Sequence, residues 1–545
     1  MKSLQQQLYA AGLVLFLFPA LYLSISILLL FLGISVQGWI LIPAFIGALI
    51  LIGLVRRNSN VPPMWVLISA GCLAFSLLIS NLYFDVSFDG QWYHQDAIMF
   101  LSDGWNPVWD HALVDSLVSG EKACWVNSYP KASWVFQSGI FQLSGNVELG
   151  KSLHLISLFS FAFLLFSFLQ YRVNLGFFKS LILTLMMSIS TITLGQIFSF
   201  YVDGVLFSFL GIFLLLWIEY LMFDKKVFIW LVFSFIFLVN LKFTGLVYAL
   251  VFCGIGMVFK LIIDRSIPVK LILNLSLMVL LGVFIIGYPT YVRNTMEKGH
   301  PLFPLMGKNN VGKEVAEVQY PKDFFTMNRF EKALKSHGSM PLFTDHDHPS
   351  VDKPLFKYDV IKASVPYYRN HQPVEMSPFG PFEAELWILF VPLMLLFLWR
   401  KPSWKWLLLI FGLLLSMAIQ PEFWNLRYAP QTLLCLGVVC LCLLMDNNPW
   451  IQRTTSVFMV LFLVNSLIAV DQNWRWVGEK SIPLERALEA SSGKTLKIQR
   501  GWMKSFELKI QYYDITPDYA LDPQGTYREF PGDSFTGWKT LVKKP

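Results

Sequence analysis

The stretch Asn81–Pro107, with the sequence NLYFDVSFDGQWYHQDAIMFLSDGWNP, opens the first long polar interval of the chain, after three apolar segments. It carries two acids, Asp85 and Asp89. Residues four apart fall on the same side of the backbone in an extended segment and also in a helix. Ionisable groups held beside a membrane span are costly and usually have a role. These two carboxylates are therefore the first candidates for a chemical centre.

The composition of the 545-residue chain is that of a membrane protein. It is 55% hydrophobic and only 14% charged, with a mean hydropathy of +0.54, whereas soluble domains carry about 25% charged residues. Apolar runs recur from Leu13 to Val470, which excludes a soluble enzyme with a membrane tail. The first run is too long for a cleaved signal peptide and another run follows at once. The sequence therefore predicts an all-α polytopic membrane protein.

We expect about thirteen spans, each near the ~20 residues that cross a ~30 Å hydrocarbon core. The expected ranges are 11–32, 38–55, 64–83, 152–170, 178–197, 204–222, 227–241, 246–262, 270–289, 385–399, 405–420, 429–445 and 454–470. Lys and Arg gather in alternate short connections, which places the N-terminus in the cytoplasm. The net charge of +7 thus reflects topology and predicts no nucleic-acid partner.

This orientation divides the chain into a membrane domain, 1–470, and a small external α/β domain, 471–545. The membrane domain has two long external loops, 84–150 and 291–383, and in a bacterium they would face the periplasm from the inner membrane. In the first loop, the stretches Asp96–Leu101 and Ser133–Leu143 predict helices lying at the membrane interface. In the tail, Ser481 before Pro483 predicts a helix start. Apolar and polar residues alternate as in strands over Thr495–Gln499 and Phe506–Tyr513.

Further polar residues share the predicted external face with the two acids. They are Asp203 at a span boundary, Lys242 in a tight turn, and Arg293, His300, Arg427 and Tyr428. Topology disfavours cations on the external face, so their presence there calls for an explanation. A phosphate ligand would explain them, because Arg binds phosphate bidentately and Lys acts as a point charge. The alternative is that each cation pairs with a nearby acid or reaches toward lipid headgroups.

Asp89 is the stronger candidate for a general base, because a partly desolvated carboxylate can accept the proton of an incoming hydroxyl. Asp85 could share that role or help to bind the acceptor, and either acid could instead cap a helix. Asp203 would complete the site or pair with Lys242. The acids Asp85, Asp89 and Asp203 also suit Mg²⁺ or Mn²⁺, although their spacing requires no metal.

Two histidine features have a structural and a functional interpretation. His94, beside Tyr93, would bind a substrate hydroxyl or make a structural hydrogen bond. The run Asp345–His348, with the sequence DHDH, is typical of a metal ligand set and equally of a solvated loop. Neither pattern decides between its two interpretations.

The motifs around these residues are similar to those of a known family. Three runs resemble bacterial members of the C-type integral-membrane glycosyltransferases. They are DVSFDGQWYH (85–94), GWNP (104–107) and SYPK (128–131). Later runs are similar to this family too. They are KFTG (242–245), RN and GHPLFP (293–304), and RYxP (427–430). The resemblance is scattered over about residues 60–445, and the chain departs from the simplest members in having three spans before the acidic loop.

The resemblance implies an enzyme with many membrane helices and an acid in its first long external loop. Such enzymes move a hexose or pentose from a polyprenyl phosphate or diphosphate to a lipid, glycan or protein acceptor, usually with inversion. By position, Asp89 or Asp85 would be the catalytic acid or base, and Lys242, Arg293 and Arg427 would hold the donor phosphate. The aromatic loop 84–150 would cover the sugar and the lipid headgroup, and Tyr93 and Tyr428 would be among the substrate-binding residues.

Two rival functions also fit a polytopic protein. An O-antigen polymerase or ligase would rely more on external Arg and His residues than on paired acids. A transporter or flippase for a lipid-linked sugar should carry charges near the midplane and inverted repeats with broken helices. In this sequence the charges cluster at one surface and no repeat is visible, which favours the transferase.

Overall fold

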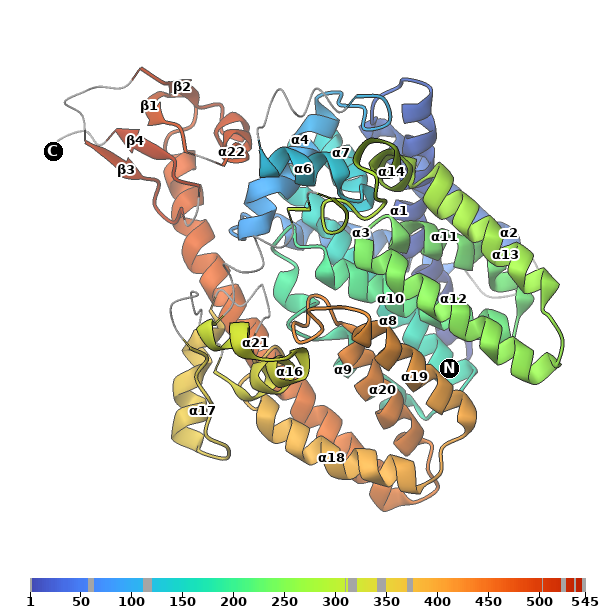
Figure 1. Cartoon of the computed structure of the whole chain (residues 1–545). Coiled ribbons are helices and arrows are strands. Elements are labelled where there is room, and N and C mark those ends of the chain that lie inside the picture. Colours follow the sequence, from blue (N-terminus) through green and yellow to red (C-terminus); the bar gives the residue numbers. More distant parts are fainter. Residues whose placement is uncertain are drawn as a thin grey trace.

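The structure is a computed structural model that is mostly helical, with one small sheet near the C-terminus (Figure 1). It describes residues 2–56, 63–110, 120–308, 310–311, 321–340, 349–369, 376–501, 503–520, 526–533 and 536–541. The predicted DHDH run, 345–348, lies outside these residues.

The first part of the chain supplies most of the long helices of a bundle. These are α1 (Lys2–Phe31), α2 (Leu41–Arg56), α3 (Met64–Ser80), α8 (Ser152–Tyr171), α9 (Phe177–Ser188), α10 (Asp203–Met222), α11 (Phe228–Val239), α12 (Phe243–Asp264) and α13 (Val269–Val279). A second group packs beside them and consists of α18 (Glu383–Trp399), α19 (Trp404–Ala418), α20 (Gln431–Leu444) and α21 (Pro449–Glu489). Shorter helices in the two long loops are α4 (Gln95–Ser102), α6 (Glu121–Ser128), α7 (Ala132–Ser144), α14 (Arg293–Lys298), α16 (Arg329–Gly338) and α17 (Tyr358–Ser364).

Several long apolar helices indicate a membrane protein. Within the described part of the chain, six helices are long and apolar enough to cross a membrane, or up to seven if the bent pair Val269–Ile285 and Tyr288–Lys298 is one span. The count of thirteen is not confirmed and stays a prediction. One reason is length: α9 and α11 have 12 residues each, or about 18 Å at 1.5 Å per residue, which is short of a ~30 Å core.

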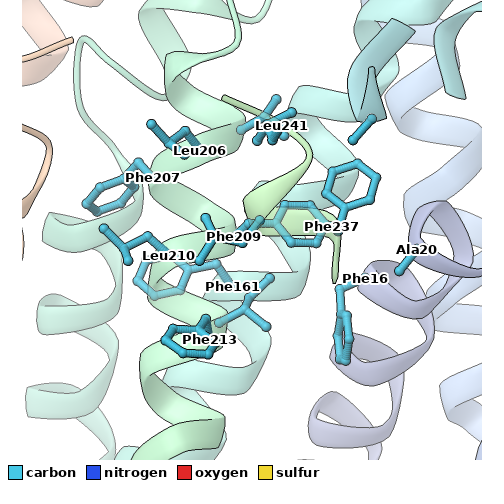
Figure 2. Packing of buried hydrophobic residues seen from close by; sticks show 14 of the residues in the cluster. Phe16, Ala20, Phe161, Leu206, Phe207, Phe209, Leu210, Phe213, Phe237 and Leu241 are labelled. Atoms are coloured by element: carbon cyan, nitrogen blue, oxygen red, sulfur yellow. The ribbon is translucent and has the colours of Figure 1, made fainter. Parts of the chain in front are cut away.

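The core of the bundle is aromatic and lies where α1, α8, α10 and α11 meet (Figure 2). The rings of Phe209 and Phe237 stack with centroids 4.2 Å apart, and Phe161 meets Phe207 edge to face at 5.5 Å. At Gly211, a Cβ atom would lie 2.3 Å from the Phe161 ring, so only glycine permits this close packing of α8 on α10. Helices that are apolar all round become buried in this way.

The basic ends of several helices meet at one end of the bundle, as the predicted topology requires. Arg172, which follows α8, donates to Glu219 near the end of α10 at 3.0 Å, and Tyr9 of α1 donates to the same carboxylate at 3.1 Å. Arg56, at the end of α2, donates to the carbonyl of Gln6 at 2.7 Å. The assignment of this end to the cytoplasm stays a prediction.

The first long loop folds onto the opposite end of the bundle (Figure 1). The two helices expected there are confirmed as α4 and α7. Both are enclosed by protein, since Gln95–Leu101 of α4 and Ala132–Ile140 of α7 are buried on polar and apolar faces alike. They are therefore part of the protein interior rather than helices lying at its surface.

The C-terminal region differs from the prediction in two elements. Helix α21 runs without a break for 41 residues and passes through Pro483, so the expected helix start at Ser481 is wrong and the expected domain boundary at 471 falls inside this helix. The stretch expected as a strand at Phe506–Tyr513 is helix α22 (Phe506–Tyr512). A short apolar run does not distinguish a strand from a buried helix, and here Phe506 and Ile510 share one face of a helix.

Four strands form a small sheet at the far end of α21 (Figure 1). They are β1 (Thr495–Gln499), β2 (Thr516–Asp518), β3 (Tyr527–Glu529) and β4 (Lys539–Leu541), in the order β2-β1-β4-β3. β1 pairs with β2 in parallel and with β4 in antiparallel orientation, which confirms the strand expected at Thr495–Gln499. We use the name C-terminal domain for the sheet and α22 together with the last turns of α21.

Candidate functional site

The segment between α3 and α4 brings Asp89 to the inner edge of the first loop. Asp89 directly precedes a π-helical turn, Gly90–His94. A Cβ atom at Gly90 would lie 1.9 Å from Oδ2 of Asp85, so the turn requires a glycine at this position. π-helical turns of this kind occur frequently at functional sites.

Four charged side chains from distant parts of the chain meet beside this turn. Arg427 donates from Nη2 to Asp89 at 2.6 Å and from Nε to Asp203 at 3.0 Å. Lys242 donates to the other oxygen of Asp203 at 2.5 Å. We call Asp89, Asp203, Lys242 and Arg427 the ionic cluster. All four were predicted as site residues, and the structure brings them together.

The cluster is buried to different depths. The side chain of Asp203 is 1% exposed, whereas that of Asp89 is 17% exposed and is the most accessible of the four. Burial acts to lower the pKa of Arg427, but the charges of Asp203 and then Asp89 outweigh it and raise that pKa above its ordinary value. Arg427 is therefore a permanent cation, and Asp89 is the carboxylate best placed to meet a ligand.

Two tyrosine rings support the cations. The guanidinium of Arg427 lies 4.4 Å from the ring centroid of Tyr201, and the ammonium of Lys242 lies 4.7 Å from that of Tyr428. Cations over aromatic faces are stabilised electrostatically, by about 2 kcal/mol when desolvated. Tyr428 was predicted as a site residue. Tyr201 was not given this role, although its place two residues before Asp203 was a signal that could have found it.

An aromatic wall formed by Tyr93, His94, Tyr129 and Trp134 adjoins the cluster. Their rings are in mutual contact, with Tyr93 and Tyr129 centroids 5.9 Å apart. Burial, followed by the charge of Asp89 on Tyr93 and that of Asp203 on Tyr129, raises the pKa of both hydroxyls well above the ordinary value. Both hydroxyls are therefore neutral hydrogen-bonding groups within electrostatic reach of the cluster.

His94 makes a structural hydrogen bond, one of the two roles considered for it. Its Nδ1 accepts from the indole Nε1 of Trp134 at 2.6 Å. Burial lowers its pKa to about 3, so the ring is neutral and the proton lies on Nε2. Trp134 and Tyr129 were not predicted as site residues, although Tyr129 stands in the SYPK motif.

Asp85 lies in a different environment from Asp89. Its carboxylate accepts from the Ser87 amide at 2.9 Å and from the Gln95 side chain at 3.0 Å, and its own amide donates to Glu148 at 2.9 Å. The side chain is fully buried. Burial and then the charge of Glu148 raise the pKa of Asp85 to about 6. Of the two candidate acids, Asp85 is enclosed by its hydrogen-bond partners and Asp89 is the accessible one.

Replacing Asp85 with asparagine is expected to change the pH dependence of stability. Because the folded-state pKa of about 6 exceeds the ordinary 3.8, the stability linked to this proton is complete below pH about 4 and is lost as the pH rises through about 6. The loss is on the order of 3 kcal/mol. Asparagine does not titrate, so the variant would not lose this stability as the pH rises. Its amide could also donate to the buried Gln95 Oε1, which has no partner among the described residues.

Unfolding midpoints of wild type and Asp85→Asn in detergent, measured at pH 4.5 and pH 7, test this expectation. The variant should gain stability relative to wild type as the pH rises. An identical pH dependence of the two proteins would show that Asp85 has an ordinary pKa.

Two predicted site residues lie away from the ionic cluster. Arg293 donates to Glu297 at 2.5 Å and to the carbonyls of Pro107 and Val108 at 3.1 and 2.8 Å, so it joins α14 to the first loop. His300 accepts from the amide of Leu302 at 3.1 Å within its own turn. Both contacts are structural, and neither residue contacts the cluster.

The three acids proposed for a divalent cation do not form a ligand set. Asp89 and Asp203 are both bonded to Arg427, and Asp85 is bonded to Ser87 and Gln95. Among the residues that the structure describes, no group of three or more His, Cys, Asp or Glu side chains is placed to hold a metal ion. The donors present therefore do not fit Mg²⁺ or Mn²⁺.

A groove with a volume of about 1140 Å³ lies between α3, α8 and α21. Its walls are largely apolar and include Phe75, Leu155, Phe159, Phe198 and Trp474, while Arg369, Asp471, Arg475 and Glu479 add charge to its lining. Phe198, in its lining, precedes Tyr201 by three residues in the sequence.

Fold and site together define a helical membrane protein with a buried ionic cluster at one end of its bundle. No protein-family model matches the chain, and comparison with curated proteins gives no significant match.

Proposed function

We propose that this protein is a membrane glycosyltransferase, as its motifs suggest. It would move a sugar from a polyprenyl phosphate or diphosphate to a lipid, glycan or protein acceptor at the periplasmic face of the bacterial inner membrane. The observation that carries the proposal is the convergence of Asp89, Asp203, Lys242 and Arg427. Such a reaction needs a base for the acceptor and cations for the phosphate, and this arrangement offers both.

Asp89 would act as the base. In this scheme an acceptor hydroxyl loses its proton to Asp89 while its oxygen bonds to the anomeric carbon of the sugar. The bond between that carbon and the phosphate oxygen breaks, and the phosphate leaves with the bonding electrons. Attack on the face opposite the phosphate inverts the anomeric centre. Asp89 is suited to this role because it is the most exposed acid of the cluster.

Arg427 and Lys242 would stabilise the departing phosphate. Both are held in place before any ligand arrives, through Asp203 and through the rings of Tyr201 and Tyr428. Preorganised cations in a buried site are effective because the charge develops where solvent water is scarce. Asp203 would thus position the two cations.

The apolar groove would hold part of the polyprenyl chain. A lipid-linked donor remains in the bilayer, so its chain needs an apolar path to the charged centre. The groove of about 1140 Å³ provides such a surface beside α3 and α8, and it reaches the segment that bears Tyr201.

Analysis of cell-envelope lipids and glycans by mass spectrometry tests the function. A strain that lacks this protein should miss one glycosylated species and accumulate its unglycosylated acceptor, and the wild-type gene should restore the product. An unchanged profile of glycolipids, glycans and glycoproteins in the deletion strain would contradict the proposal.

Arg427→Lys is expected to lower the transfer rate about 10²- to 10³-fold. Lysine keeps the charge but cannot bridge Asp89 and Asp203 while facing a phosphate, because it lacks the planar fork of arginine. Arg293→Lys is the matched control, since Arg293 contacts Glu297 and backbone carbonyls outside the cluster. Product formation in complemented deletion strains measures the effects of both substitutions. Equal effects of the two substitutions would remove Arg427 from the phosphate site.

A further inference from the structure

The segment that carries Asp89 begins inside the C-terminal domain. Phe84, the residue before Asp85, belongs to the hydrophobic core of that domain, which is otherwise formed by Leu484, Leu488, Ile498, Phe506, Ile510, Ile515, Phe530 and Trp538. Its ring meets Tyr513 edge to face at 6.4 Å, and the ammonium of Lys509 lies 5.7 Å from its centroid. A residue of the first loop is thus packed among residues about 400 positions later in the chain.

Hydrogen bonds fix the same segment at both of its ends. The amide of Phe84 donates to the hydroxyl of Ser481 in α21 at 2.6 Å. The hydroxyl of Ser505, just before α22, donates to the carbonyl of Gln91 at 2.7 Å. Asp89 lies between these two anchors, two residues before Gln91. Both bonds are buried, so water competes with them little.

A buried charge group joins the domain to the base of the loop. The carboxylate of Glu148 lies 2.6 Å from the ammonium of Lys151 and 3.9 Å from that of Lys509, which belongs to α22. Glu148 also accepts from the amide of Asp85 at 2.9 Å. Lys509 is 1% exposed. Glu148 therefore faces Lys151 at the base of the loop and Lys509 of α22 at the same time.

We infer that the C-terminal domain is a positioning element of the site, which holds the Phe84–Gln91 segment so that Asp89 meets Arg427. Ser505 and Phe84 are its positioning residues, and they act through the backbone on either side of Asp89. In Figure 1, α22 lies against the first loop beside α4, consistent with the contact of Lys504 over the Phe100 ring at 5.3 Å. The domain is therefore more than an appendage at the end of α21.

Hydrogen exchange of the full-length protein in detergent tests this inference without any substrate. In Ser505→Ala and Phe84→Ala, peptides covering residues 84–95 should exchange about tenfold faster, while peptides from α8 and α10 keep wild-type protection. Ser491→Ala is the matched control, because Ser491 lies in the turn after α21 and its hydroxyl bonds to the carbonyl of Ala487 in that helix. Wild-type exchange of 84–95 in both test variants would overturn the inference.

Complementation of the deletion strain gives the second measurement, which rests on the proposed function. Product formation should fall about tenfold in Ser505→Ala and Phe84→Ala, since small displacements of a reacting group are costly. Phe84→Leu and Ser505→Thr should recover both the exchange protection and most of the product. Loss of product with wild-type exchange would contradict positioning. If the variants exchange faster and the wild-type protein itself forms no sugar product, positioning is supported and the glycosyltransferase proposal is rejected.

Discussion

Asp89→Asn is expected to lower the rate of sugar transfer by a factor of about 10² to 10⁴, the usual contribution of a general base. Asparagine has nearly the same shape but cannot accept the acceptor's proton. Arg427 keeps its bond to Asp203, and Lys242 keeps its own. Since Asp89 is the most exposed member of the cluster, the fold should survive the change.

Product formation by the complemented deletion strain, normalised to protein in the membrane, measures this effect. Asp103→Asn is the control, because Asp103 is an exposed residue that follows α4 in the same loop. The control should form product at the wild-type rate. Wild-type activity of Asp89→Asn would exclude Asp89 from the chemical step.

Asp203→Ala is expected to destabilise the protein by about 3–5 kcal/mol, the usual result of removing one partner from a buried ion pair. Asp203 is the anion that Lys242 and Arg427 share, and its side chain is 1% exposed. Its loss leaves two buried cations and only Asp89 to compensate them. We expect a large fall in the unfolding temperature and in the yield of folded protein.

The ion pair of Asp446 with Arg400 provides a comparison for Asp203. Its nitrogen and oxygen are 2.9 Å apart, but the Arg400 side chain is 39% exposed. Asp446→Ala should therefore cost less than Asp203→Ala: about 1 kcal/mol for the ion pair, together with the loss of the bond that its carboxylate accepts from the Asn448 amide. Thermal unfolding of both variants in the same detergent measures the difference. Similar costs for the two substitutions would show that the cluster is not held in a low-dielectric interior.

The convergence of the ionic cluster could be predicted from the sequence, although Asp89 and Arg427 are 338 residues apart. The signal was topological: acids and cations stood at the ends of apolar segments assigned to one face. Arg427 and Lys242 pair with acids, which was the alternative to a phosphate ligand as the reason for these cations. Pairing with acids and binding of a phosphate are compatible, so the phosphate hypothesis stays a prediction.

The separate roles of Asp85 and Asp89 could not be predicted from their spacing. Asp85 accepts from the amide of Ser87, two residues on, a local turn that directs the carboxylate to the backbone. The π-helical turn that follows Asp89 has no clear sequence signature. The position of Arg293 away from the cluster could not be predicted for a similar reason, because two of its acceptors are backbone carbonyls, which any residue can provide.

The tail was the least predictable part. Pro483 indicated a helix start, but α21 passes through it, since burial of Ser481, Leu484 and Leu488 against the C-terminal domain stabilises the helix on both sides of the proline. The docking of Phe84 into that domain depends on contacts across almost the whole chain, which local patterns do not record.

The most direct test of the central claim is transfer by the purified protein. Wild type and Asp89→Asn in lipid nanodiscs would be given radiolabelled polyprenyl-phosphate hexoses and pentoses, with membranes of the deletion strain as the source of acceptor. We predict that wild type moves label from one donor to the acceptor fraction and that Asp89→Asn does not. Label that stays on every donor with wild type, or moves equally with the variant, would contradict the proposed function.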